Sequence, residues 1–128
     1  MAAFSNYLED ALINGTLRAT TYTAPTTVYV ALFTSDPTDA GSGSELSGNG
    51  YARQSATFAA PSNGAASTDA DVQFPQATGT QGTVTHFAIF DALTTGNMLY
   101  HGALTASKTI ETGDVFKIAT GNLTVTLA

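Results

Sequence analysis

The sequence predicts an all-β fold, a jelly-roll-like β-sandwich of about eight short antiparallel strands with one short N-terminal helix. From residue 27 onward, short segments rich in Val, Ile, Thr, Tyr and Phe alternate with Gly, Pro, Asn and Asp. Helical periodicity is confined to the start of the chain. A β-barrel is the alternative arrangement. The length of 128 residues suits one structural domain over 1–128.

The predicted helix covers residues 5–14. Apolar residues recur at i, i+4, i+7 and i+8, which places them on one face: Phe4, Leu8, Ala11 and Leu12. Asn6 and Glu9 have the spacing of a capping box, and Asn14-Gly15 provides a stop signal. A helix this short is marginal in isolation, so we expect it to dock on another surface.

Strands are expected near 27–34, 51–59, 70–74, 83–91, 97–104, 108–111, 114–118 and 122–127, and the pattern also allows one near 17–22. Apolar residues alternate with threonines from Leu123 to Leu127, as in a strand with one buried face. In contrast, Val28 to Phe33 and Phe87 to Phe90 are apolar on both faces. These two segments are therefore predicted to be central strands, or strands covered by the N-terminal helix.

Turn signals separate the predicted strands at Asn49-Gly50, Asn63-Gly64, Thr95-Gly96 and Gly113-Asp114. Residues 35–50 form one long polar loop that is expected to be too rich in Gly and Ser to pack. At its start, Asp36-Pro37 is typical of a turn, because Asp favours the first position and Pro fixes φ at the second.

The charge pattern argues against several classes of partner. Charged residues make up 11% of the chain, and the net charge is −6. The four basic residues lie far apart in the sequence: Arg18, Arg53, Lys108 and Lys117. Nucleic-acid binding requires clustered cations, and an anionic membrane would repel the chain, so we expect neither partner.

The sequence also argues against export by the general secretory route. No apolar run approaches the length of a membrane helix, and no basic region followed by an apolar block is present at the start. The expectation is synthesis and assembly in a host cytoplasm. The chain has no Cys, so disulfides and thiolate metal sites are excluded.

Catalysis is not expected. His86 and His101 lie within strand patterns, and Asp91 and several serines could be proposed as their partners. However, no sharp Gly-flanked nucleophile turn lies near either histidine, so structural or interface roles are favoured.

Metal and phosphate sites are not expected either. Two groups of acidic residues could offer oxygen ligands to calcium. The first is Asp36, Asp39 and Glu45 in the long loop, and the second is Asp69 with Asp71. Neither has EF-hand spacing, so solvated carboxylates are the favoured interpretation. The Gly-rich run that begins at Gly41 lacks the Lys and the following helix of a phosphate-binding loop, so no cofactor is expected.

Carbohydrate binding is a further alternative, because tyrosine rings stack on sugars. The tyrosines considered for this role are Tyr22, Tyr29, Tyr51 and Tyr100. The chain has no Trp and these tyrosines fall in strand patterns, so core or interface packing is favoured over sugar binding.

Three blocks of sequence resemble a family of small tailed-bacteriophage virion proteins. They are SNYLEDALINGTLR with YTAPTTVYVALFTSDPTDAGSGSELSGNGYARQ, then TVTHFAIFDALTTGNMLYHGALT, and finally GDVFKIATGNLTVTL. The chain also resembles jelly-roll cement proteins of phage capsids in size and expected fold. The most distinctive elements are ALFTSDP and GYARQ, and the similarity extends over nearly the whole chain.

The resemblance implies a structural component of the virion. The first hypothesis is a capsid cement or decoration protein that bridges neighbouring subunits of the major capsid protein. The alternative is a tail fibre or tail adaptor domain that binds another virion protein, with host-glycan binding by its exposed loops as an added function. A homo-oligomer, dimer or trimer, is expected in either case.

The expected interface combines the helix, the long loop and one basic residue: Phe4, Tyr7, Leu8, Leu12, Asp36, Asp39 and Arg53. Arg53 is the only cation in a long acidic-to-neutral stretch. Its planar guanidinium is therefore expected to pair with a carboxylate, either within the fold or across an interface.

Overall fold

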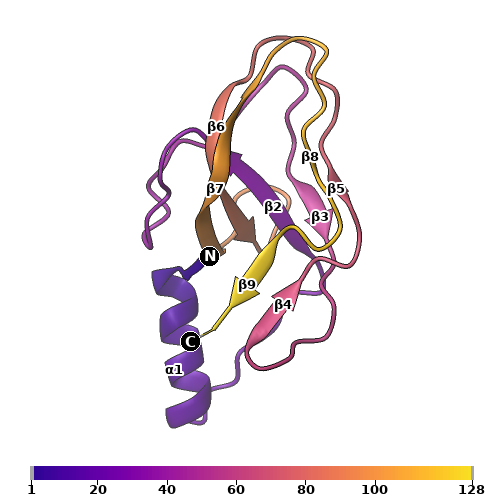
Figure 1. Ribbon diagram of the computed structural model, residues 1–128. Helices are drawn as coiled ribbons and strands as arrows, with labels where there is room; N and C mark the ends of the chain where they lie inside the picture. The colour runs from indigo at the N-terminus through magenta and orange to yellow at the C-terminus, as the bar shows by residue number, and fades with distance from the viewer. Residues whose placement is uncertain (1, 128) are drawn as a thin grey trace.

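A computed structural model describes residues 2–127, shown in Figure 1. The elements in order are β1 (Ala3–Phe4), α1 (Asn6–Leu17), β2 (Val28–Phe33), β3 (Gln54–Ala56), β4 (Ala65–Ser67), β5 (Val72–Gln73), β6 (Gly82–Phe90), β7 (Met98–Ile110), β8 (Lys117–Ile118) and β9 (Thr124–Thr126). Five of the strands form an antiparallel sheet in the order β1-β7-β6-β2-β3. Two antiparallel ribbons, β4-β9 and β5-β8, complete the β structure.

The main core lies between the five-stranded sheet and the two ribbons. Val30 and Leu32 of β2 are fully buried in it, and the ribbons contribute Val72 and Val125. Phe74 joins the same core and packs edge-on against Phe116. This packing of two β layers confirms the predicted all-β fold with a short N-terminal helix.

A second, smaller core covers the opposite face of β2 and β6. Its buried members are Ala31, Phe33, Ala88, Phe90 and Met98. The rings of Phe33 and Phe90 are stacked, with centroids 6.3 Å apart. Because β2 lies between β6 and β3 and is buried on both faces, the prediction of central strands is confirmed.

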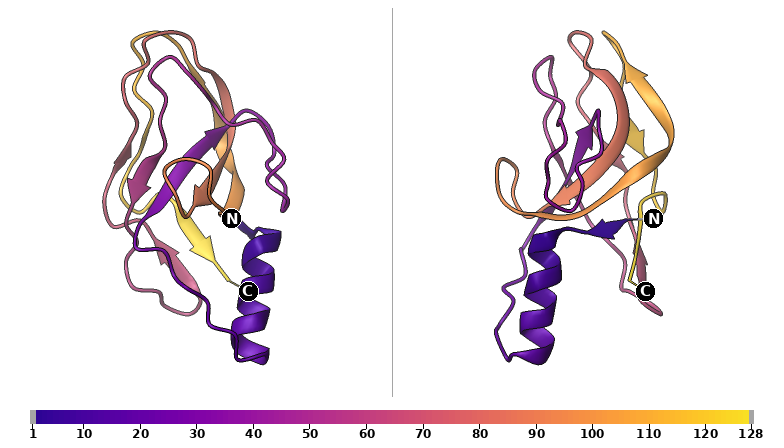
Figure 2. Two further views of the ribbon diagram at one scale, coloured as in Figure 1. Left: turned by 180° about the vertical axis from the view of Figure 1, so that it is seen from behind. Right: turned by 90° about the vertical axis from the view of Figure 1, so that its left-hand side faces the viewer.

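The predicted helix exists, but its N-cap and its C-terminal end differ from the prediction. Ser5, not Asn6, is the N-cap, and its side-chain oxygen accepts a hydrogen bond from the Leu8 amide at 3.1 Å. The helix continues through Asn14-Gly15 to Leu17, because the chain reverses only at Ala19, which has a φ of 54°. Helix α1 consequently extends beyond the sheets at one end of the molecule (Figure 2).

Several strands differ from the prediction. The strands predicted at 97–104 and 108–111 are one continuous strand, β7, because β6 pairs with both parts across a register shift. Strands β1 and β4 were not predicted, since both are short and Ala-rich and are defined by their pairing with β7 and β9. The segment 18–22, which followed the pattern of a strand, contains none.

The predicted turns are confirmed. Asn49-Gly50, Asn63-Gly64 and Thr95-Gly96 each place two successive residues at positive φ, as type I′ turns require. The Thr38 amide donates to the Asp36 carboxylate at 2.8 Å, which closes the turn predicted at Asp36-Pro37.

The long loop packs more closely than predicted. Pro37 is fully buried, and Leu46 is only 5% exposed and belongs to the main core. The loop returns to the end of β2, where the Thr34 amide donates to the Ser44 carbonyl oxygen at 2.9 Å. The expectation that residues 35–50 are too polar to pack is therefore wrong, because backbone hydrogen bonds and two apolar residues anchor the segment.

Candidate functional site

Most of the predicted interface residues lie where the long loop meets α1. The Asn6 amide, at the start of α1, donates to the Asp39 carbonyl oxygen at 2.9 Å. Next to it, the Ser5 amide donates to the Leu99 carbonyl oxygen of β7 at 2.9 Å. The helix, the loop and the central sheet are therefore joined through the backbone at one corner of the molecule.

A cavity of about 380 Å³ lies at this corner. Its walls come from the start of α1, from the long loop and from the turn that precedes β7, and its lining residues are Ser5, Asn6, Tyr7, Asp39, Ala40, Gly41, Phe90, Gly96, Asn97 and Met98. Asn97 is held by Asp91, which accepts from the Asn97 amide at 2.7 Å and from its side chain at 3.1 Å. Asp91 therefore orders the turn that forms one wall, and does not face either histidine through a hydrogen bond.

The predicted interface residues of the helix differ in their accessibility. Leu8 is 3% exposed and Phe4 packs edge-on against Tyr100, with ring centroids 5.5 Å apart. Leu12 is partly buried, whereas Tyr7 is 42% exposed. Leu8 and Phe4 thus fix α1 to its own chain, and Tyr7 remains accessible to a partner.

His101 anchors the long loop to β7. Its Nε2 atom lies 2.7 Å from Oδ1 of Asp39, and its Nδ1 atom lies 3.8 Å from Oδ1 of Asp36. The side chain of His101 is only 10% exposed. Because the two carboxylates face opposite nitrogens of one ring, the arrangement fastens the loop to the sheet. Local sequence patterns do not predict this contact, since 62 positions separate His101 from Asp39.

His86 has a local partner. Its Nδ1 atom lies 2.8 Å from the hydroxyl oxygen of the neighbouring Thr85. This contact joins two neighbouring side chains of β6.

Arg53 pairs with a carboxylate inside the fold, as predicted. Its Nε and Nη2 atoms donate to the two oxygens of Glu45 at 2.9 Å each. Its Nη1 atom donates to the carbonyl oxygens of Ala92 and Thr95 at 3.0 and 2.8 Å. The guanidinium carbon also lies 3.7 Å from the centre of the Phe90 ring. The residue therefore acts within the chain, where it joins the long loop to the turn before β7.

Tyr51 completes this buried network. Its hydroxyl donates to Oε2 of Glu45 at 2.6 Å and accepts from the Leu32 amide at 3.1 Å. Burial of the side chain, followed by the hydrogen bond to Glu45, raises the pKa of Tyr51 well above its usual range. In the GYARQ motif, Tyr51 thus fastens the long loop to β2, and Arg53 fastens the same loop to the turn before β7.

The carboxylates considered as calcium ligands have separate roles. Asp69 accepts a hydrogen bond from the Thr57 hydroxyl. Asp71 accepts from the backbone amide and the hydroxyl of Thr120 at 2.8 Å each, and these two bonds lower the pKa of Asp71. Within residues 2–127, no group of three or more His, Cys, Asp or Glu side chains is arranged to hold a metal ion.

The four tyrosines considered as sugar-stacking residues lie in different environments. Tyr51 is committed to the Glu45 network, and Tyr100 packs against Phe4. Tyr29 is half-buried on β2. Tyr22 instead lines a groove beside α1 together with Tyr7. No local sequence pattern relates these two tyrosines, because the turn after α1 brings them together.

A family model described as podophage GP4 fiber I protein gp80 matches residues 3–126. The chain belongs to this phage fibre family. No curated protein matches it. Membership confirms the resemblance to phage virion proteins and favours the fibre alternative over the capsid cement hypothesis. Over the described part of the fibre-family chain, no helix has the length and apolar character needed to cross a membrane.

Proposed function

We propose that this fibre-family chain is a non-enzymatic structural subunit of a phage tail fibre, attached to another virion protein and to further copies of itself. The observation that carries the proposal is the match of the fiber I family over residues 3–126. Residues 2–127 fold as β layers with one short helix, and in this proposal they act as a compact module within a larger assembly.

The attachment surface in this proposal is the accessible side of α1. We call it the N-terminal surface and define it by two exposed residues one helical turn apart, Ile13 and Leu17, which are 54% and 80% exposed. Large apolar side chains this accessible are typical of protein contacts when they are grouped on one element. Since α1 extends beyond the sheets, a partner can reach these residues without disturbing the core (Figure 2).

Low charge supports the same role. Lys, Arg, Asp and Glu make up only 11% of the chain. Burial of an unpaired charge at an interface opposes binding, because the ion loses its hydration. A surface dominated by Thr, Ala and Gly avoids this cost. Repeated contacts of modest strength then hold a subunit firmly, since each contact raises the effective concentration of the next.

The non-enzymatic part of the proposal is supported by the engagement of the candidate groups. His101 is held between Asp36 and Asp39, and His86 by Thr85. Arg53 and Glu45 bind each other. These contacts hold loops and strands in place, which is a structural use of polar side chains.

Localisation on the particle tests the proposal. Cryo-electron microscopy of the phage that encodes the chain, or antibody labelling of its virions, should place the protein on the tail. Labelling confined to the head would overturn the tail assignment and favour a cement protein. In that case, deletion of the gene should lower the heat resistance of the capsid and leave host attachment unchanged.

The N-terminal surface is tested separately with purified variants. The double variant Ile13→Asp with Leu17→Asp should fold normally but fail to enter virions when it replaces the wild-type protein. Val115→Asp is the matched control, because Val115 is also apolar and 47% exposed but lies outside α1. Normal incorporation of the double variant, or equal loss with the control, would show that α1 is not the attachment surface.

A further inference from the structure

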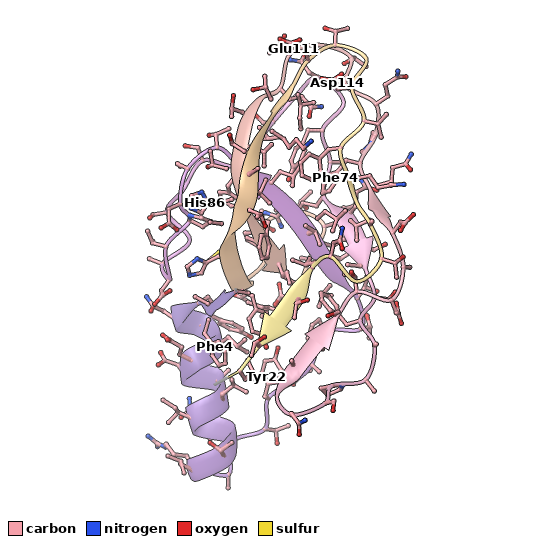
Figure 3. The ribbon with its side chains drawn as sticks, in the orientation of Figure 1. Phe4, Tyr22, Phe74, His86, Glu111 and Asp114 are labelled. Carbon is pink, nitrogen blue, oxygen red and sulfur yellow. The ribbon has the colours of Figure 1, made fainter. Side chains whose placement is uncertain are left out.

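A groove of about 400 Å³ runs between α1 and the extended segment that follows it. The walls are one face of the helix and the residues that return alongside it, and the lining residues are Tyr7, Asp10, Ala11, Asn14, Thr20, Thr21, Tyr22 and Thr23. The labelled Tyr22 lies beside α1 in Figure 3, at the end of the molecule remote from Glu111 and Asp114. The groove therefore belongs to the protruding N-terminal part of the molecule.

Local backbone geometry creates the groove. The chain reverses at Ala19, where φ is 54°, and the Thr20 amide then donates to the Asn14 carbonyl oxygen at 3.1 Å. Residues 20–23 consequently return along the helix face that carries Tyr7, Ala11 and Asn14, which are spaced at i, i+4 and i+7. Ala11 occupies the middle of this row, and its small side chain leaves the floor of the groove open.

Four polar side chains of the groove are not used within the described part of the fold. Among residues 2–127, the side chains of Tyr7, Asp10, Asn14 and Tyr22 form no hydrogen bond or ion pair. Together they offer two hydroxyls, a carboxylate and an amide in a single depression. Elsewhere the chain uses such groups to hold loops in place, as Asp71, Asp91 and Tyr51 do. The groove is thus a concentration of free donors and acceptors.

Two tyrosine rings border these polar groups. Tyr7 is 42% exposed, and Tyr22 is partly buried. Burial, followed by the nearby Tyr7 and Asp91, raises the pKa of Tyr22, so its hydroxyl is a neutral donor and acceptor at physiological pH. An aromatic ring offers an apolar face of fixed shape together with a polar edge.

The charge of the groove restricts the ligand. Asp10 is the one charged lining residue, and it is negative. The chain as a whole carries −6. Phosphates and acidic sugars would meet repulsion here with no cation in the lining to offset it. An anionic ligand is therefore disfavoured. The hydroxyls, carboxylate and amide of the lining suit a ligand that is rich in hydroxyl groups and flat enough on one face to contact a tyrosine ring.

We propose that the groove between α1 and residues 20–23 binds a neutral pyranose sugar, with Tyr7 and Tyr22 in contact with the ring and with Asp10 and Asn14 bonded to its hydroxyls. The C–H face of a pyranose matches the aromatic rings, and its hydroxyl pairs match the carboxylate and amide. The site is shallow, so binding of a single sugar is weak, with a dissociation constant on the order of 1 mM. Several copies in one assembly strengthen attachment to a polysaccharide.

Saturation-transfer NMR on the isolated chain tests this proposal. The probes are the methyl pyranosides of glucose, galactose, mannose, rhamnose and N-acetylglucosamine, each at millimolar concentration. At least one should receive saturation at its ring protons. Both Ala11→Leu, which fills the floor and suits a helix, and Asp10→Asn, which removes the acceptor charge, should weaken that binding roughly tenfold.

Controls separate loss of binding from loss of folding. Glu9→Gln is the matched control for Asp10→Asn, because Glu9 lies on the same helix, is exposed and does not line the groove. It should bind sugar like the wild type, and every variant should melt at the wild-type temperature. Absence of binding by all five probes, or binding that Ala11→Leu and Asp10→Asn leave unchanged, would overturn the proposal. Neither result depends on where the protein lies on the virion, so the fibre assignment stands or falls separately.

Discussion

The guanidinium of Arg53 and the carboxylate of Glu45 form two parallel hydrogen bonds, Nε to Oε2 and Nη2 to Oε1, each 2.9 Å long. The side chains are 8% and 25% exposed, so water competes little for either group. Such bidentate pairs are directional as well as strong, because the planar fork of arginine matches the two carboxylate oxygens. The pair joins the long loop to the strand segment that leads into β3.

Arg53→Lys should destabilise the fold. Lysine cannot donate to both oxygens of Glu45 and to the carbonyl oxygens of Ala92 and Thr95 at the same time. We expect the free energy of unfolding to fall by about 3 kcal/mol, as when a buried ion pair loses one partner. Urea denaturation measures the change.

The matched control is Lys117→Ala. Lys117 forms a 3.7 Å ion pair with Asp71, but both side chains are about half exposed. This change should leave the free energy of unfolding nearly unchanged, because an exposed ion pair is screened by water. Equal effects of the two substitutions would show that the Arg53 pair is no stronger than a surface ion pair.

Tyr51→Phe should remove one hydrogen bond from the buried network without changing its shape. The Leu32 amide then loses its side-chain partner in the interior. We expect a loss of about 1 to 2 kcal/mol in unfolding free energy at neutral pH. Chemical denaturation of the purified variant measures it, and an unchanged midpoint would contradict the assigned role.

The same residue predicts the response to alkaline pH. Burial raises the pKa of Tyr51 in the folded state, so the folded chain retains a proton that the unfolded chain releases above about pH 10. The stability contributed by neutral Tyr51 is therefore complete below about pH 10 and declines as pH rises towards the folded pKa. Unfolding free energy should fall more steeply above this pH in the wild type than in Tyr51→Phe. Parallel curves would refute the assignment.

Leu8→Asp should separate the helix from the sandwich. Leu8 is 3% exposed, and a carboxylate in its place loses hydration without a partner. We expect a loss of a few kcal/mol and a clear drop in melting temperature by circular dichroism. Ile13→Asp is the control on the same helix, since Ile13 is 54% exposed and the change should be nearly neutral. If both variants melt like the wild type, the apolar stripe does not hold α1.

Gly64→Ala should destabilise the turn that joins β4 to the preceding segment. The residue has a φ of 78°, and an added Cβ would lie 2.7 Å from the Leu127 carbonyl oxygen. Backbone strain and the clash together should cost about 2 kcal/mol or more. Gly113→Ala isolates the strain, because Gly113 has a φ of 89° with no atom near the added Cβ. Melting curves should show the larger loss for Gly64→Ala, and the reverse order would contradict the clash.

Much of the fold could be predicted because its signals are local. Alternation in the last strand, the apolar runs of β2 and β6 and the Asn-Gly turns each depend on a few adjacent residues. The N-cap of α1 was predicted less accurately than the turns, since Ser5 and Asn6 are adjacent and either side chain can cap a helix. Strands β1 and β4 could not be predicted, because their sequences have no periodicity and only their pairing partners define them.

The candidate sites show the same difference between local features, which the sequence predicts, and long-range contacts, which it does not. By itself, the sequence determined an all-β chain of low charge, its turns, and the need of Arg53 for a carboxylate. Only the tertiary structure decided that Glu45 is that carboxylate, that His101 meets Asp39, and that Tyr7 and Tyr22 border one groove. The physical reason is that composition and turns act over a few residues, whereas pairing of side chains depends on how distant strands and loops close in space.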